Sequence, residues 1–244
     1  MKKLIITLLS LALIFAFCAC GNDDADIRGT IIGNDTDNVA DTTNNETADT
    51  TADATVDTQP EEEGEDLSLG VNDGAVYESK FIGLGYALDE GWIFYNDDQI
   101  KELNNITSSL AGEEYEEIIK NATLIYDMYA TDAEMLNNIN INLEKVDHIQ
   151  LIALDIAANF ELIAPTIKTS FENMGYTNFS YEIAKVTVDG VEMDAMKTTA
   201  EIQGIKMFQT MFQKKCNGYL ANIAVTSFVT DSNAELIENF YWLE

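Results

Sequence analysis

The sequence predicts an α/β protein of the α+β type, a single domain in which helices cover a central, mainly antiparallel sheet. Two observations carry this prediction. Four strand-length runs with alternating apolar residues fill the last third of the chain and are joined by two-residue turns, and an apolar stripe at helical spacing precedes them. Strands joined by such short turns pair antiparallel, and a helix with one apolar face must bury it against a sheet or another helix.

Composition divides the chain into three parts. Residues 1–19 contain the basic pair Lys2 and Lys3 followed by an apolar run. Residues 20–75 are rich in Asp, Thr, Asn, Ala and Glu. Aromatic and alternating apolar residues begin at about Val76. A segment as polar as 20–75 buries too little apolar surface to offset the entropy of ordering it. We therefore predict a signal peptide over 1–19, a disordered acidic linker over 20–75 and one globular domain over 76–244.

The first half of the domain is expected to contain short strands and two short helices. Asn96 or Asp97 can cap a helix that runs through Leu103, with acids in the first turn where the helix dipole favours them. A second short helix is expected over 113–120. The expected strands cover 76–89, in two pieces around Gly83 and Gly85, then 92–95, 123–130 and 139–146.

One long helix is predicted over 151–174. Its apolar stripe consists of Leu151, Leu154, Ile156, Ala157, Phe160, Ile163, Ile167, Phe171 and Met174. Pro165 lacks a backbone donor, so a kink or break is expected at 162–164. Gly175 is expected to end the helix.

The last third is expected to form an antiparallel meander with a closing helix. The strands are predicted at 179–188, 191–202, 205–215 and 219–229, joined by Asp189-Gly190, Gln203-Gly204 and Asn217-Gly218. Ser232 or Asn233 is expected to cap a helix over 234–242 that packs on the sheet.

The N-terminus carries a lipidation signal. Cys20 follows the apolar run directly, and the small residues Ala19 and Gly21 flank it, in a pattern that resembles the lipobox of bacterial lipoproteins. Cys18 suits the cleavage less well because Phe17 precedes it. The resemblance implies a diacylglycerol-type lipid on Cys20 and a protein tethered to the outer side of a cell membrane. An uncleaved anchor and an ordinary secretory signal are the alternatives.

Charge and cysteine content exclude several classes of function. The chain has 13 Lys and Arg against 43 Asp and Glu, a formal net charge of -30, which disfavours binding to nucleic acid or to anionic lipid headgroups. Once Cys18 leaves with the signal and Cys20 carries lipid, only Cys216 remains, so neither a disulfide framework nor a cysteine-rich zinc site can form. Cys216 is expected to be a half-buried residue at a hairpin end.

We identify no catalytic set, no metal site and no cofactor motif. His148 is the only histidine, and no serine lies in a Gly-x-Ser-x-Gly elbow. Acidic groups around Asp97, Asp98 and Glu102, or over 113–117, have side chains that suit calcium, but such spacings more often form a solvated helix face.

Aromatic residues are the remaining candidates for a binding site. We single out Tyr86, Trp92, Tyr95 and Trp242 as residues that can line a groove, with Tyr126 and Tyr129 as further members. A core position is the favoured interpretation for Trp92 and Tyr126, which sit among apolar neighbours. Trp242, near the end of the expected C-terminal helix, is the residue most expected to be partly exposed.

The order of elements resembles the PsbP/DcrB-like fold over nearly all of 76–244. The segment 88–92 (Leu-Asp-Glu-Gly-Trp) is similar to that family's Leu-Pro-x-Gly-Trp turn, with Asp89 in place of proline. Segments 77–85, 126–130 and 140–144 resemble uncharacterised single-domain lipoproteins of Gram-positive, clostridia-like bacteria. The resemblance implies an accessory or binding module and carries over no catalytic residue.

Two functions follow as hypotheses. The first is a membrane-anchored, extracytoplasmic, non-enzymatic module that binds a protein or a cell-envelope component. The alternative is an envelope hydrolase that uses carboxylates the sequence does not single out. A deep pocket in which two or three carboxylates with raised pKa converge favours the enzyme, and a flat aromatic patch favours the binding module.

Overall fold

The computed structural model describes residues 67–106 and 113–244, so the predicted signal peptide, Cys20 and nearly all of the predicted linker lie outside the described residues. The helices are α1 (Asp97–Leu103), α2 (Glu113–Asn121), α3 (His148–Ala153), α4 (Ile156–Asn173) and α5 (Asn233–Ile237). The strands are β1 (Val71–Asn72), β2 (Val76–Ser79), β3 (Leu84–Ala87), β4 (Trp92–Phe94), β5 (Leu124–Asp132), β6 (Asn138–Lys145), β7 (Thr177–Val188), β8 (Val191–Ile202), β9 (Ile205–Cys216), β10 (Tyr219–Phe228) and β11 (Phe240–Trp242).

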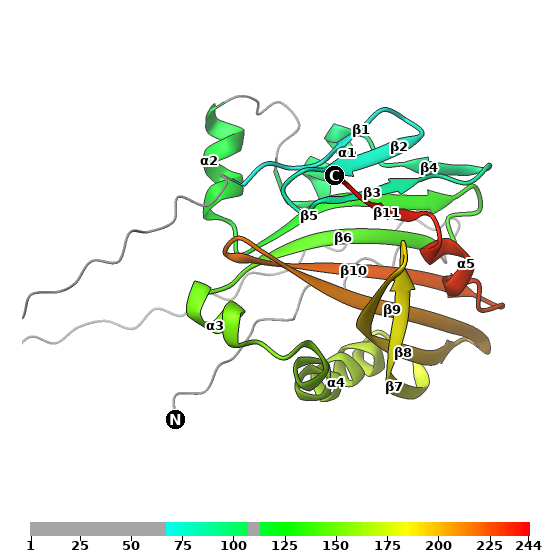
Figure 1. Cartoon of the computed structure of the whole chain (residues 1–244). Helices are drawn as coiled ribbons and strands as arrows, with labels where there is room; N and C mark the ends of the chain where they lie inside the picture. Colours follow the sequence, from blue (N-terminus) through cyan, green and yellow to red (C-terminus); the bar gives the residue numbers. More distant parts are fainter. Residues whose placement is uncertain (1–66, 107–112) are drawn as a thin grey trace, which may run out of the picture. The chain divides into compact units, whose positions relative to one another are not determined.

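The strands form two antiparallel sheets (Figure 1). The small sheet has the order β1-β2-β3-β11, and the large sheet has the order β4-β5-β6-β10-β9-β8-β7. In the large sheet, β7 to β10 follow one another through tight turns, and β10 pairs with β6 over eight residues. The predicted α+β class and the antiparallel meander are therefore confirmed.

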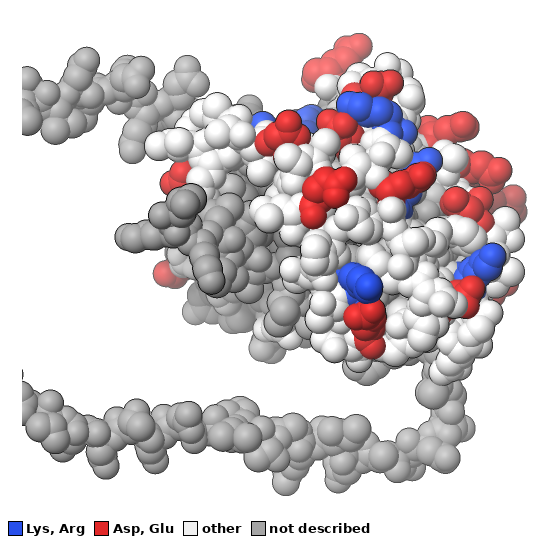
Figure 2. Space-filling view, turned by 90° about the horizontal axis from the view of Figure 1, so that it is seen from below, with Lys and Arg blue, Asp and Glu red and all other residues white. Residues whose placement is uncertain are grey.

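Charged side chains lie mostly on the surface. The face in Figure 2 shows acidic and basic side chains interspersed with uncharged surface rather than gathered in one patch. The described ion pairs are largely exposed, as in Lys168 with Glu172 at 3.8 Å, and exposed pairs stabilise a fold little. Asp127 and Asp132 are the buried acidic side chains of the described residues, with exposed fractions of 5% and 9%.

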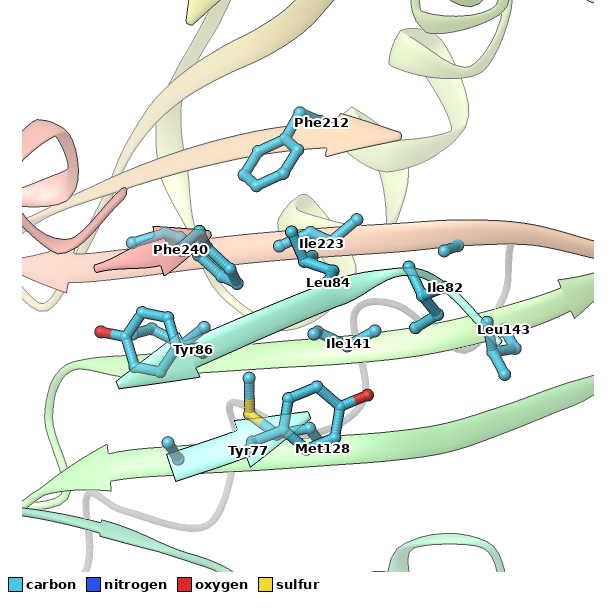
Figure 3. Packing of buried hydrophobic residues seen from close by; sticks show 14 of the residues in the cluster. Tyr77, Ile82, Leu84, Tyr86, Met128, Ile141, Leu143, Phe212, Ile223 and Phe240 are labelled. Atoms are coloured by element: carbon cyan, nitrogen blue, oxygen red, sulfur yellow. The ribbon is translucent and has the colours of Figure 1, made fainter. Parts of the chain in front are cut away.

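The main core lies between the two sheets (Figure 3). The small sheet contributes Tyr77, Leu84, Tyr86 and Phe240, and the large sheet contributes Met128, Ile141, Phe212 and Ile223. The ring of Phe240 lies 4.5 Å from that of Tyr86 and 5.6 Å from that of Phe212, measured between ring centroids. Phe240 thus joins the two sheets through aromatic contacts, which add to the gain from burying apolar area.

A second cluster lies on the opposite face of the large sheet, where α4 covers it. Phe160, Ile163 and Ile167 of α4 pack against methionines of β8 and β9. These helix positions belong to the stripe that the sequence analysis identified. The large sheet is therefore covered by a sheet on one face and by a helix on the other.

The predicted helix over 151–174 is two helices, which corrects the sequence analysis. Leu154 is extended, and the Asp155 side chain accepts a hydrogen bond from the Ala158 backbone N–H at 3.0 Å, so α4 begins there with its own cap. Pro165 lies inside α4 and does not break it. Pro165 is exposed, so the carbonyl that loses its helical donor can bind water instead.

Both ends of the domain also differ from expectation. The predicted closing helix over 234–242 ends at Ile237, and Phe240–Trp242 is a strand that pairs with β3. Residues 67–75, which the sequence analysis assigned to the linker, include β1, which pairs with β2. Backbone pairing and burial against the sheet outweigh local sequence preference at both ends.

Phe240→Ala is expected to destabilise the domain by about 3–5 kcal/mol, because it removes a buried ring that contacts both sheets and leaves a cavity. Urea unfolding followed by fluorescence measures the change. Leu162→Ala is the control, since Leu162 is 64% exposed on α4. A loss below about 1 kcal/mol for Phe240→Ala would mean that β11 does not hold the sheets together.

Candidate functional site

Three cavities flank one segment, residues 67–73, which we call the strap. A cavity of about 340 Å³ lies between the strap, α1 and β5, and Asp127 lines it. A second cavity of about 710 Å³ lies along β1 and β2, and a third of about 410 Å³ lies beside α2. We call the strap and the side chains that line these cavities the strap surface.

A β-bulge positions Asp127 toward the strap. The register between β5 and β6 shifts between Tyr126 and Met128, so an extra residue interrupts the alternation of β5. The Asp127 carboxylate accepts a hydrogen bond from the Tyr77 hydroxyl at 2.7 Å and another from the Gly70 backbone N–H at 2.7 Å. One side chain of β5 therefore holds both β2 and the strap.

Gly70 is needed for this contact. A Cβ atom built on Gly70 would lie 2.2 Å from the ring of Tyr77, far inside van der Waals contact. A glycine therefore lets the strap backbone approach the Tyr77 ring closely enough to reach Asp127.

Burial dominates the electrostatics of Asp127. Desolvation raises the pKa of its carboxyl to about 6, although the hydrogen bonds from Tyr77 and Gly70 act in the opposite direction. Burial and the neighbouring carboxylate likewise raise the pKa of Tyr77 well above its usual value. Tyr77 therefore stays a neutral hydrogen-bond donor at physiological pH.

The rest of the first cavity is more open. Asp97 is exposed, and the Lys101 ammonium lies 5.4 Å from the centre of the Tyr115 ring. Two carboxylates thus line this cavity. That of Asp127 is buried and accepts hydrogen bonds from Tyr77 and Gly70, and that of Asp97 is exposed to solvent. The arrangement can bind a hydrogen-bonding group beside Lys101, and Asp127 is positioned primarily as a structural tie.

The second cavity presents apolar and aromatic groups beside a sheet edge. Tyr241 donates a hydrogen bond to Glu78 at 2.9 Å, and its ring lies so close to Gly85 that a Cβ there would be 2.3 Å away. Val71 is 72% exposed. Its strand, β1, is the terminal strand of the small sheet, so its outer edge has no strand partner among the described residues.

The structure does not bring together the four aromatic residues that the sequence analysis singled out. Tyr86 is fully buried, which corrects its assignment to a groove, and Trp92 is half-buried against the main core. Tyr95 packs on Tyr129 at 4.5 Å between ring centroids. Trp242 is half-buried, and its indole N–H donates to the Val188 carbonyl at 3.0 Å.

The strap surface uses residues that the sequence analysis missed. Val71 lay in the predicted linker and Tyr241 in the predicted closing helix, so neither was expected at a surface of the sheet. Tyr115 lies on α2, which was predicted correctly, but the sequence did not indicate that residues of the strap would line cavities beside it. Only the apolar residues Leu67, Leu69 and Val71, spaced by two, could have indicated an extended segment there.

The remaining reactive groups do not form a site. Cys216 is half-buried as expected, and burial raises the pKa of its thiol to about 11, which disfavours the nucleophilic thiolate. His148 is exposed at the start of α3. Over 67–106 and 113–244, no group of three or more His, Cys, Asp or Glu side chains is arranged to hold a metal ion.

None of the helices that the structure describes has the length and apolarity needed to cross a membrane. No protein-family model matches the chain, and no curated protein matches it. Among solved structures, the chain is similar to the cyanobacterial PsbP protein CyanoP from Synechocystis sp. PCC 6803, with 12% identity and a TM-score of 0.40 over 74% of this chain and 98% of that one. A likeness at that level supports no inference about binding, location or activity.

Asp127→Asn is expected to change how stability depends on pH. The pKa of the Asp127 carboxyl is about 6 in the folded protein, against an ordinary value of 3.8. The folded state therefore binds this proton more tightly than the unfolded state does. The resulting stabilisation is complete at low pH and is lost as pH rises through about 6. The stability of the variant relative to wild type should therefore increase between pH 4 and pH 7 by at most about 3 kcal/mol, at about 1.4 kcal/mol per pKa unit. Urea unfolding across this range measures it.

Asp97→Asn is the matched control, because Asp97 lines the same cavity but is exposed. Its stability relative to wild type should change little over the same pH range. A flat difference between Asp127→Asn and wild type would contradict the buried, desolvated state of Asp127.

Proposed function

We propose that this protein is a lipid-anchored, extracytoplasmic, non-enzymatic module that binds a protein or cell-envelope component through the strap surface. The observation that carries the proposal is the set of open cavities around residues 67–73. They are lined by half-buried leucines, the exposed Val71, two tyrosines and a strand edge that has no strand partner among the described residues. Apolar and tyrosine side chains at an open surface are typical of protein contacts.

The shape of the strap surface supports binding to an extended partner. The outer edge of β1 offers backbone groups to a further strand, and the cavities on either side can receive its side chains. The widest cavity is open and lined by residues of different character, including Val71, Glu78 and Tyr241. This combination suits a peptide segment better than a small molecule that needs enclosure.

The proposed anchor and linker would keep the strap surface within the reach of a flexible tether from the membrane. Fifty or so residues behaving as a flexible coil span roughly 40 Å root-mean-square, and repulsion among acids extends that distance. The strap is the part of the described chain closest in sequence to this linker. A partner bound there would be held at the attachment point of the tether, within reach of cell-wall material.

The hydrolase hypothesis has one observation in its favour, the buried Asp127 whose pKa is raised to about 6. A carboxyl that titrates near neutrality can act as a general acid or base. Here both of its oxygens accept hydrogen bonds from groups that hold the fold together. We therefore rank hydrolysis second, with Asp127 as its acid and the cavity beside Lys101 as its site.

Cys20→Ala is expected to release the protein from membranes, because the proposed lipid is its only proposed anchor. Fractionation of cells followed by a carbonate wash measures the membrane-bound share. Cys18→Ala is the matched control and should stay bound. Retention of the Cys20→Ala variant in washed membranes would show that lipid on Cys20 is not the anchor.

A photo-crosslinking residue placed at Val71 is expected to give a discrete adduct in the native host, because Val71 is exposed at the centre of the strap surface. The same residue at Val229, which is 69% exposed outside that surface, is the control and should give none. Gel mobility and mass spectrometry identify the adduct. Equal labelling from both positions, or none from Val71, would contradict binding at the strap surface.

A further inference from the structure

A further cavity, separate from the three at the strap, lies on the face of β7, β8 and β9 that also carries residues of the main core. It has a volume of about 360 Å³, within the range of small-molecule sites. Two cross-strand rows form its floor: one row is Ser180, Thr199 and Phe208, and the other is Glu182, Lys197 and Thr210. Asp231, which precedes α5, and Asn233, the first residue of α5, complete it. We call it the β7–β9 cavity.

Asn233 gives the first indication of a ligand. Its side chain is 2% exposed, and its amide N–H donates to the Thr210 hydroxyl at 3.3 Å. Its Oδ1 atom has no hydrogen-bond partner among the described residues. Leaving a buried acceptor unpaired costs about 1–3 kcal/mol, so a donor in the cavity would stabilise this arrangement.

The charged groups give the second indication. Glu182 and Lys197 are directly opposite each other in the register of β7 and β8, yet neither belongs to an ion pair among the described residues. By contrast, Lys185 and Asp194 on the same strand pair lie 2.7 Å apart. The ammonium of Lys197 and the carboxylate of Glu182 therefore remain available to a bound molecule.

We propose that the β7–β9 cavity binds a small neutral saccharide. Sugar hydroxyls donate and accept hydrogen bonds, and the cavity supplies both kinds of partner: acceptors on Glu182, Asp231 and Asn233, and donors on Lys197 and the hydroxyl residues. The half-buried ring of Phe208 offers an apolar surface to the C–H face of a sugar. The formal net charge of -30 works against an anionic ligand at a site that has a single cation.

Isothermal titration calorimetry on the full-length protein in detergent tests the proposal. The neutral probes are N,N′-diacetylchitobiose, cellobiose and trehalose, and trehalose 6-phosphate is the anionic counterpart of the last. The expected result is saturable binding of at least one neutral disaccharide. Trehalose 6-phosphate should bind more weakly than trehalose.

Lys197→Met and Thr199→Val locate the site, because both residues are exposed and can be replaced without disturbing the core. Each should weaken sugar binding by about tenfold through loss of one polar contact. Lys206→Met is the matched control, since Lys206 is an exposed lysine of β9 outside the cavity lining, and its affinity should equal that of wild type.

Three results would overturn the proposal: no saturable binding of any of the three neutral probes, unchanged affinity in both cavity variants, or tighter binding of trehalose 6-phosphate than of trehalose. The strap surface is lined by other residues, so the crosslinking result at Val71 neither supports nor removes the saccharide site.

Discussion

Each face of the seven-stranded sheet carries an apolar cluster, and the fold depends on covering both clusters. A helix covers one face through residues close in sequence to the strands it meets, since α4 leads directly into β7. The other face needs the small sheet, whose strands come from opposite ends of the domain. The contacts of Phe240 with Tyr86 and Phe212 are where these ends meet the large sheet. The largest cavity at the strap lies where these ends meet, because both the strap and Tyr241 of β11 line it.

Asp127 shows how such a surface can be held in place at a cost. Burying a carboxylate is unfavourable, and the bulge in β5 interrupts a regular ladder. The Asp127 carboxylate accepts a hydrogen bond from the strap backbone and so fixes the strap to the large sheet. Strand pairing through β1, which has two residues, would hold the strap only weakly by itself. The same contact holds the exposed Val71 close in sequence to the rest of the predicted linker, where a tethered binding module would need an apolar contact.

The sequence predicted those elements that local rules determine. In the first two turns of the meander, both residues of each pair have positive φ, as in Asp189 and Gly190, and such turns have a recognisable composition. The Asn96 cap of α1 was equally readable. The strand at Phe240–Trp242 and the tie at Asp127 were not, because each depends on a partner far away in the chain. The break at Asp155 is local, but its cap lies inside a continuous apolar stripe that indicated one helix. The strap surface was missed because its residues come from segments spread along the chain, namely the strap, β2, α1, α2, β5 and β11, and none of these segments carries a motif.

The pairing of β3 with β11 also has a consequence for how the protein is made. Leu84 and Trp242 are partners, so the small sheet cannot close until residues more than 150 positions apart are both available. If the chain is exported N-terminus first, as the proposed lipoprotein signal implies, β2 and β3 leave the channel before β11, and their apolar face stays uncovered until β11 follows. That apolar face would be prone to aggregation during the interval, whereas the meander of β7 to β10, whose turns are local, can pair as soon as it emerges.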